Sequence, residues 1–426
     1  MNSEKQFSTN ENNFVSRRLE TTVFYLIGYM YLINACIPLY LDYSIKTLAA
    51  FLLVSLMSLI VFQRKITFDI SSVEITFFFV LWLCWGIFSL YWAFSPTNVK
   101  AFTIKNFQYL AILMFYLILS HNRTFFKYQR LFFLLFTLLF IGISLWEMTS
   151  FSHLPSSRFT KKNIFTYIPT AVFTNENDLG SAFVCYIPFL LLYLKRKLHF
   201  LVKILLSVAL LYFMIVIIIS GARLALIASS IILLGYWLFF TRKKTKIITC
   251  ISILLVLTAF YYFSPTHVKI TKLLIEEQIE SLSTDNESIY TSSVQIRLRL
   301  FKIGYRFLVE SKLLGVGNGN FEAHMNPTEM VETGNIFNPH NLFLEIGVNN
   351  GIIILLFFIY IYLKRMILYI REFRRKPTPL VTHYIFLGFA FIVACSVSSS
   401  ISSYYLFWMY LFYFLFGYRE MISEED

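Results

Sequence analysis

The sequence predicts an all-α protein that crosses a membrane many times. Three observations indicate this class: 57% of the 426 residues are hydrophobic, only 14% are charged, and the hydrophobic residues form long blocks. A soluble domain carries about a quarter charged residues, whereas about 20 consecutive apolar residues form a helix that spans a bilayer. A membrane β-barrel has shorter segments of alternating polarity. A soluble enzyme, a disordered chain and a free nucleic-acid-binding protein are therefore not expected.

We predict about twelve transmembrane helices, with boundaries good to a few residues. Because the sixth block is short and the seventh and eighth are nearly continuous, eleven or thirteen helices remain open. The predicted spans are 22–41, 45–62, 74–94, 103–120, 131–150, 179–194, 200–219, 222–240, 246–264, 341–363, 380–398 and 401–418.

The basic residues predict which side of the membrane each loop faces. Lys and Arg concentrate in short cytoplasmic loops. If the amino terminus is cytoplasmic, basic clusters such as 195–197, 242–244 and 371–376 all fall inside. We therefore expect both termini to be cytoplasmic. We also expect no cleavable signal peptide, because the amino terminus opens with about 20 mostly polar residues followed by a long span. The net charge of +13 then needs no nucleic-acid partner.

Cysteine and histidine usage predicts neither a disulfide nor a metal site. The five cysteines all lie in predicted spans and form no Cys-x-x-Cys pair. His153, His267 and His324 lack the spacing to carboxylates that metal ligands show. We expect no metal and no cofactor.

One long loop divides the chain into three parts. Residues 1–264 hold the first nine spans, residues 265–340 form an extracytoplasmic loop, and residues 341–426 hold the last three spans. A loop of this length is uncommon unless it has a function or structure of its own. Helical apolar spacing at 267–282 and 294–314 predicts two helices within it, the second amphipathic and suited to a membrane surface.

The second predicted helix carries two candidate cations. Leu298, Phe301 and Tyr305 are expected on one face, and the helix is expected to end at the glycine-rich residues 315–320. Arg297 and Arg299 would bind an anionic phosphate, or alternatively form a solvated face attracted weakly to anionic lipid. Residues two apart on a helix cannot both point the same way.

Two further candidates lie where predicted spans meet the outer boundary. Arg223 follows three small residues, and a cation between apolar blocks usually has a defined partner. It either binds a phosphate through its guanidinium or reaches to the membrane surface. His340 can accept a proton from a sugar hydroxyl; alternatively its segment only caps the next span, through Asn338 or Asn341.

A polar run, Asn175, Glu176, Asn177 and Asp178, precedes the sixth span. These residue types cap helix amino termini, and we favour that role. Amides and carboxylates also hydrogen-bond sugar hydroxyls, so glycan binding is the alternative. Glu147, near the outer end of the fifth span, is a similar candidate.

Together these pieces resemble the O-antigen ligase and Wzy-type polymerase superfamily over about residues 150–365. The order is an arginine after small residues at 220–223, an arginine-headed helix that ends in 315–317, then 339–341 and Gly351. Arg299 and Gly315 have the spacing of the Arg-fifteen-residues-Gly pattern associated with polymerases. The run 167–178 is most similar to the teichuronic-acid biosynthesis branch.

The resemblance implies a GT-C-like fold and a metal-independent glycosyltransferase in the bacterial cytoplasmic membrane. It would polymerise glycan repeats carried on undecaprenyl diphosphate at the outer face, in the synthesis of a cell-envelope polysaccharide such as teichuronic acid or capsule. The implied roles are diphosphate binding by Arg223, Arg297 and Arg299, and proton acceptance by His340. The run 175–178 and Asn341 would contact glycan.

Alternatives remain open at this point. A ligase would move a finished glycan to another acceptor by the same chemistry, and a transporter or flippase would move lipid-linked sugars. A sensor or scaffold is a fourth possibility. The implied partners are the lipid-linked oligosaccharide and membrane lipid, and the resemblance also allows for flippase and chain-length regulator proteins. No nucleic acid is implied.

Overall fold

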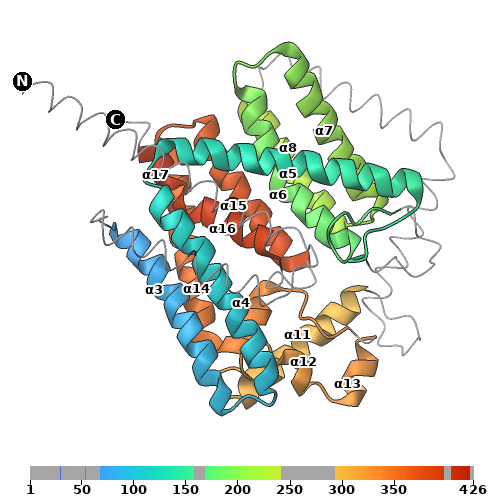
Figure 1. Ribbon diagram of the computed structural model, residues 1–426, viewed down its shortest axis with the longest axis vertical. Helices are drawn as coiled ribbons and strands as arrows, with labels where there is room; N and C mark the ends of the chain where they lie inside the picture. Colours follow the sequence, from blue (N-terminus) through green and yellow to red (C-terminus); the bar gives the residue numbers. More distant parts are fainter. Residues whose placement is uncertain are drawn as a thin grey trace, which may run out of the picture.

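The computed structural model describes residues 29, 53, 68–157, 168–240, 293–334, 336–397 and 404–422. Within these residues all regular structure is helical and there is no strand, so the predicted all-α class is confirmed (Figure 1). The predicted spans 22–41 and 45–62, apart from residues 29 and 53, and the predicted span 246–264 and helix 267–282 lie outside the described residues.

Eight helices of the described residues are long and apolar enough to cross a membrane, which confirms a multi-pass protein. Each corresponds to one predicted span, and the total of twelve stays a prediction. The eight are α3 (Ile70–Phe88), α4 (Pro96–Leu119), α5 (Arg123–Ser150), α6 (Glu176–Lys195), α7 (Phe200–Ile219), α8 (Arg223–Phe240), α14 (Leu342–Arg375) and α15 (Pro379–Val397).

The last predicted span is shorter than expected. It contains α16 (Tyr405–Phe416), followed by the short α17 (Tyr418–Ile422). All of Leu406–Phe416 is buried, and Trp408 stacks on Tyr109 of α4 with ring centroids 4.4 Å apart. A 12-residue helix that is apolar all round is typical of a buried core helix. In Figure 1, α16 accordingly lies in the middle of the bundle, where it packs against α4 and α15.

The long loop contributes three helices that gather at one end of the molecule (Figure 1). They are α11 (Ser293–Glu310), α12 (Phe321–His324) and α13 (Pro327–Glu332), and all lie against α14 or against one another. They share a small apolar core with the amino-terminal part of α14. This core is formed by Leu300, Ile303, Phe307, Val316, Phe321, Met325 and Val348.

Candidate functional site

Helix α11 has two apolar faces: the predicted one is exposed, as a membrane-surface helix requires, and a second one packs on the protein. Leu300 and Phe307 face the small core, whereas Leu298, Phe301 and Tyr305 are each more than half exposed. Periodicity alone does not tell which of two apolar stripes meets the protein. The exposed stripe remains suited to a membrane surface.

The end of α11 also differs from the prediction. The helix stops at Glu310, before the glycine-rich residues. Lys312 and Leu313 already adopt left-handed backbone, with φ of 52° and 67°. Since this conformation is unfavourable for residues other than glycine, the surrounding contacts must hold it.

Arg297 and Arg299 lie on different flanks of α11, as two residues apart on a helix must. The Arg299 guanidinium donates a hydrogen bond from Nη1 to the carbonyl oxygen of Glu332, at 2.8 Å, which ties α11 to the end of α13. Arg297 is half-buried and has no hydrogen bond or ion pair with another described residue. Burial lowers the pKa of its guanidinium. A partly desolvated cation without a partner is a candidate anion-binding group.

The glycine-rich turn after α11 clasps a break in α14. Gly351 has φ 84° and ψ 171°, which interrupts the helix. The N–H groups of Val316 and Gly317 donate to the carbonyl oxygens of Val348 and Asn349, at 2.8 and 3.1 Å. Below the break, the Ile352 N–H donates to the Leu313 carbonyl at 3.0 Å. The turn therefore supplies hydrogen bonds that the interrupted helix cannot make for itself.

This contact explains two of the glycines in the recognised motifs. A Cβ added to Gly315 would lie 2.5 Å from the backbone nitrogen of Gly351, and a Cβ on Gly351 would lie 2.6 Å from the Leu313 carbonyl oxygen. Both residues also have left-handed φ. Both glycines belong to the motifs read from the sequence, but their contact was not predictable, because no local pattern encodes a contact across 36 residues.

His340 and Asn341 stand at the beginning of α14. The Asn341 side chain accepts a hydrogen bond from the Leu344 N–H at 3.0 Å, so it caps the helix. His340 is partly buried, with its Nδ1 shielded from solvent, and adopts left-handed backbone with φ 52°. Strained backbone of this kind clusters at ligand-binding and active sites. His340 thus lies on the half of α14 to which the glycine turn and α11 are attached.

The polar run before α6 forms the expected cap. The Asn175 side chain accepts from the Asp178 N–H at 3.0 Å and donates to the Asp178 carboxylate at 2.7 Å. The Tyr404 hydroxyl donates to the same carboxylate at 2.7 Å. Asn175, Glu176 and Asp178 are buried, and Asn177 is only partly exposed. Glycan binding by this run stays a hypothesis, and burial leaves Asn177 as its most accessible member.

Glu147 holds the segment that leads to α6. Its fully buried carboxylate accepts hydrogen bonds from the N–H groups of Thr170 and Ala171, at 2.8 and 2.7 Å. His153 Nδ1 lies 3.1 Å from the other carboxylate oxygen. Burying a carboxylate is costly unless it is hydrogen-bonded, and the two backbone N–H donors meet this requirement for Glu147.

Arg223 begins α8 and is exposed. Its side chain has no hydrogen bond or ion pair with another described residue. Helix α8 packs on α6, α7 and α15, whereas α11 packs on α13 and α14. The structure therefore does not bring the Arg223 guanidinium into contact with Arg297, Arg299 or His340.

Lys105 is a candidate functional cation that was not predicted from the sequence. Lys105 lies in the membrane-spanning helix α4, with its ammonium 4.2 Å from the centre of the Phe102 ring. It interacts electrostatically with Glu345, a buried carboxylate one turn into α14. Ionisable residues within spans mark functional sites by default. A lysine inside the predicted span 103–120 is visible in the sequence, but the long apolar block that contains it was interpreted only as a membrane span. Among the described residues, no three His, Cys, Asp or Glu side chains cluster as metal ligands do.

These features define a polytopic helical membrane protein whose loop helices pack against a broken membrane helix. The family model of O-antigen ligase matches residues 208–359, which include Arg223, α11, the glycine turn, His340 and Gly351. The resemblance to the O-antigen ligase superfamily is therefore confirmed.

A curated relative extends the similarity to nearly the whole chain. This chain is 23% identical to the teichuronic acid biosynthesis protein TuaE of Bacillus subtilis (strain 168) over 433 aligned positions. The alignment covers 95% of this chain and 84% of that protein.

Proposed function

We propose that this chain is a membrane glycosyltransferase of cell-surface polysaccharide biosynthesis. In the specific form of the proposal, it polymerises glycan repeats carried on undecaprenyl diphosphate at the outer face of the cytoplasmic membrane. The observation that carries the proposal is the clasp between the glycine turn 315–317 and the break at Gly351. This clasp joins arginine-headed α11 to the helix that begins at His340 and Asn341.

The reaction needs a stabilised leaving group. The acceptor hydroxyl forms a new bond to the anomeric carbon while the bond from that carbon to the diphosphate oxygen breaks, and the diphosphate leaves with the electron pair. Preorganised cations aimed at this developing charge lower the barrier. Arg297 has no partner among the described residues, and Arg299 uses one of its five N–H donors on Glu332. We assign both to the diphosphate, with Arg223 as a further candidate.

His340 is the proposed proton acceptor. The hydroxyl proton must leave as the new glycosidic bond forms, and a histidine ring can take it at neutral pH. His340 is the residue before the α14 cap and is only partly buried, so an acceptor arriving from outside could reach the exposed part of its ring. No metal or cofactor enters this scheme.

The orientation and the partners are part of the same proposal. The basic loops support cytoplasmic termini, which puts α11–α13 outside. A flippase that delivers the donor and a protein that regulates chain length are the expected partners.

A ligase and a transporter are the two alternatives to a polymerase, and each would have different structural features. The family description supports a ligase, which performs the same transfer onto a separate acceptor. A transporter would be expected to show related halves and polar sites near the membrane midplane. The candidate residues here favour an enzyme, because they gather at one end of the described helices.

The test is transfer by the purified chain in vesicles that contain a diphosphate-linked oligosaccharide lipid. A ladder of repeats without added acceptor would support the polymerase. A single shift that requires a second acceptor would replace the polymerase by the ligase. No transfer, with labelled lipid crossing the bilayer, would overturn the enzyme. His340→Ala should abolish the product, and His199→Ala, an exposed histidine at the start of α7, is the matched control.

A further inference from the structure

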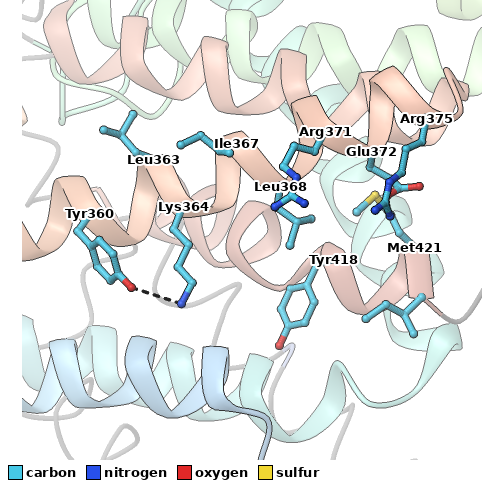
Figure 2. A pocket seen from close by; sticks show the side chains of 11 residues that line it. Tyr360, Leu363, Lys364, Ile367, Leu368, Arg371, Glu372, Arg375, Tyr418 and Met421 are labelled. Carbon is cyan, nitrogen blue, oxygen red and sulfur yellow. Dashed lines mark hydrogen bonds and ion pairs between the residues drawn. The ribbon is translucent and has the colours of Figure 1, made fainter.

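A groove of about 760 Å³ lies along the carboxyl-terminal part of α14, far along that helix from His340 (Figure 2). One wall is α14 and the other is α17. The apolar part is formed by Leu363, Ile367 and Leu368 of α14 with Met421 and Ile422 of α17. None of the candidate transfer residues lines it, so the groove needs its own explanation.

Along α14 the groove lining changes from Leu363 and Ile367 to Arg371 and Arg375. The part of α14 below the break, 352–375, is about 36 Å long at 1.5 Å per residue, which exceeds the roughly 30 Å hydrocarbon core. We place the outer boundary at the break rather than at residue 341 of the predicted span 341–363, because Trp85 near the end of α3 and Trp92 just after it donate to the Leu314 and Gly315 carbonyls beside the break. The last turns of α14, with Arg371 and Arg375, then lie at headgroup level. Leu363 and Ile367 lie further into the hydrocarbon layer and are about half exposed. This order matches a phospholipid, whose charged head is followed by its acyl chains.

The cations at headgroup level are open. Arg371 and Arg375 are one helical turn apart and so share a face. Both are exposed, and Arg371 has no ion pair or hydrogen bond with any described residue. Among the described residues, the only acidic side chain that lines the groove is Glu372, which lies 3.6 Å from the exposed Arg375 (Figure 2). A guanidinium pair of this kind suits a phosphate, which it can bind through paired N–H donors.

The third basic lining residue is already neutralised. The Lys364 ammonium donates to the Glu74 carboxylate of α3 at 2.5 Å. The positive charge available to a ligand is therefore concentrated at Arg371 and Arg375, at the end where a phosphate would lie. Charge and apolar surface are separated in the same way in an anionic phospholipid.

We propose that this groove binds one anionic phospholipid of the cytoplasmic leaflet. Its phosphate lies between Arg371 and Arg375, and its chains run along Ile367, Leu363 and the α17 wall. The basic loops put this end of α14 in the cytoplasm, where anionic lipids attract basic residues next to the membrane. The proposal does not depend on the proposed transfer reaction.

The test uses the full chain in phosphatidylcholine nanodiscs with and without phosphatidylglycerol. Native mass spectrometry counts retained lipid, and thermal unfolding gives Tm. Arg371→Gln/Arg375→Gln removes the phosphate ligands. Arg374→Gln/Lys376→Gln removes two exposed charges from the same turn that do not line the groove, and is the matched control.

We expect phosphatidylglycerol to raise the Tm of the wild type and the control, with about tenfold weaker retention in Arg371→Gln/Arg375→Gln. An equal loss in the control would overturn the proposal, because general surface charge would then explain binding. An equal Tm increase with sodium phosphate in pure phosphatidylcholine would also overturn it, since the ligand would be a soluble phosphate. The Tm in phosphatidylcholine alone checks folding, and no transfer assay is involved.

Discussion

Two regions of the described helix bundle treat their charges in opposite ways, the buried polar cluster next to α17 and the end with α11. In the cluster next to α17, Arg130 and Glu420 form a buried ion pair at 2.6 Å, and the Tyr384 hydroxyl donates to the same carboxylate. At the end with α11, Arg297 and Arg223 have no such contacts among the described residues, and His340 has strained backbone.

The difference separates charges that stabilise the packing of the helices from charges that are free to bind a ligand. A charge that is buried and paired is expensive to expose and holds its helices together when both partners are present. A partly exposed cation without a partner contributes little to folding but can meet an anionic ligand. We therefore assign stability to the buried Arg130–Glu420 cluster next to α17 and transfer chemistry to the α11 end, and the following experiments test that division.

The largest expected effect is on transfer at the α11 end. Arg223→Ala and His340→Ala are each expected to reduce the transfer rate by about 10²-fold or more, because they remove a diphosphate ligand and the proton acceptor. The protein level and Tm should stay near those of the wild type. Full activity in both variants would remove these residues from the site.

In the cluster next to α17, the expected effect is on stability. Glu420→Gln leaves Arg130 buried without its charged partner and should lower the free energy of unfolding by about 3–5 kcal/mol. Transfer per folded molecule should be unchanged. The double variant Arg130→Met/Glu420→Leu should recover much of the loss, as measured by thermal unfolding. A double variant as unstable as the single one would mean that the pair itself is not the cause.

The clasp should show an intermediate effect on both properties. Gly315→Ala places a methyl group against the backbone of Gly351 in left-handed conformation, for which we expect a loss of about 1–3 kcal/mol together with reduced transfer. Gly142→Ala is the control, since a Cβ there meets no atom within 4 Å and helix propensity favours alanine. If both variants unfold at the same temperature, the close contact between Gly315 and Gly351 does not exclude a side chain at residue 315.

The smallest effect concerns acid stability next to α17. Burial would raise the pKa of Asp69, but hydrogen bonds from Ser72, Tyr418 and Arg419 outweigh it and hold this pKa well below its usual range. The resulting stabilisation is present above the unfolded pKa of about 3.9 and is lost as pH falls through the folded pKa. Asp69→Asn should therefore show a smaller fall in Tm than the wild type between pH 5 and pH 2. Parallel curves would contradict this.

Local features of the fold were predictable from the sequence. The caps at Asn175 and Asn341 rest on side chains that bond backbone a few residues away, so residue type and order suffice to predict them. Long apolar blocks likewise predict α3–α8 closely. The last span was predicted too long, because composition alone does not separate a buried core helix from a lipid-facing one.

Contacts between distant segments were not predictable. Gly315 against Gly351, and Lys105 near Glu345, depend on which helices pack together. The choice between the two apolar stripes of α11 depends on the same packing. A single sequence shows the periodicity of each helix but not its neighbour, so the motif residues could be named without their geometry.

The clasp between the glycine turn and the break at Gly351 also constrains the order of folding. Residues 313–317 donate to and accept from residues 348–352, on both sides of the interruption. The loop is made before α14 during synthesis, yet these backbone groups gain their partners only once α14 has formed. The two segments should therefore become protected from hydrogen exchange together, as one cooperative unit. The segment that contains α11–α13 is thus completed by α14, and the two form one structural unit.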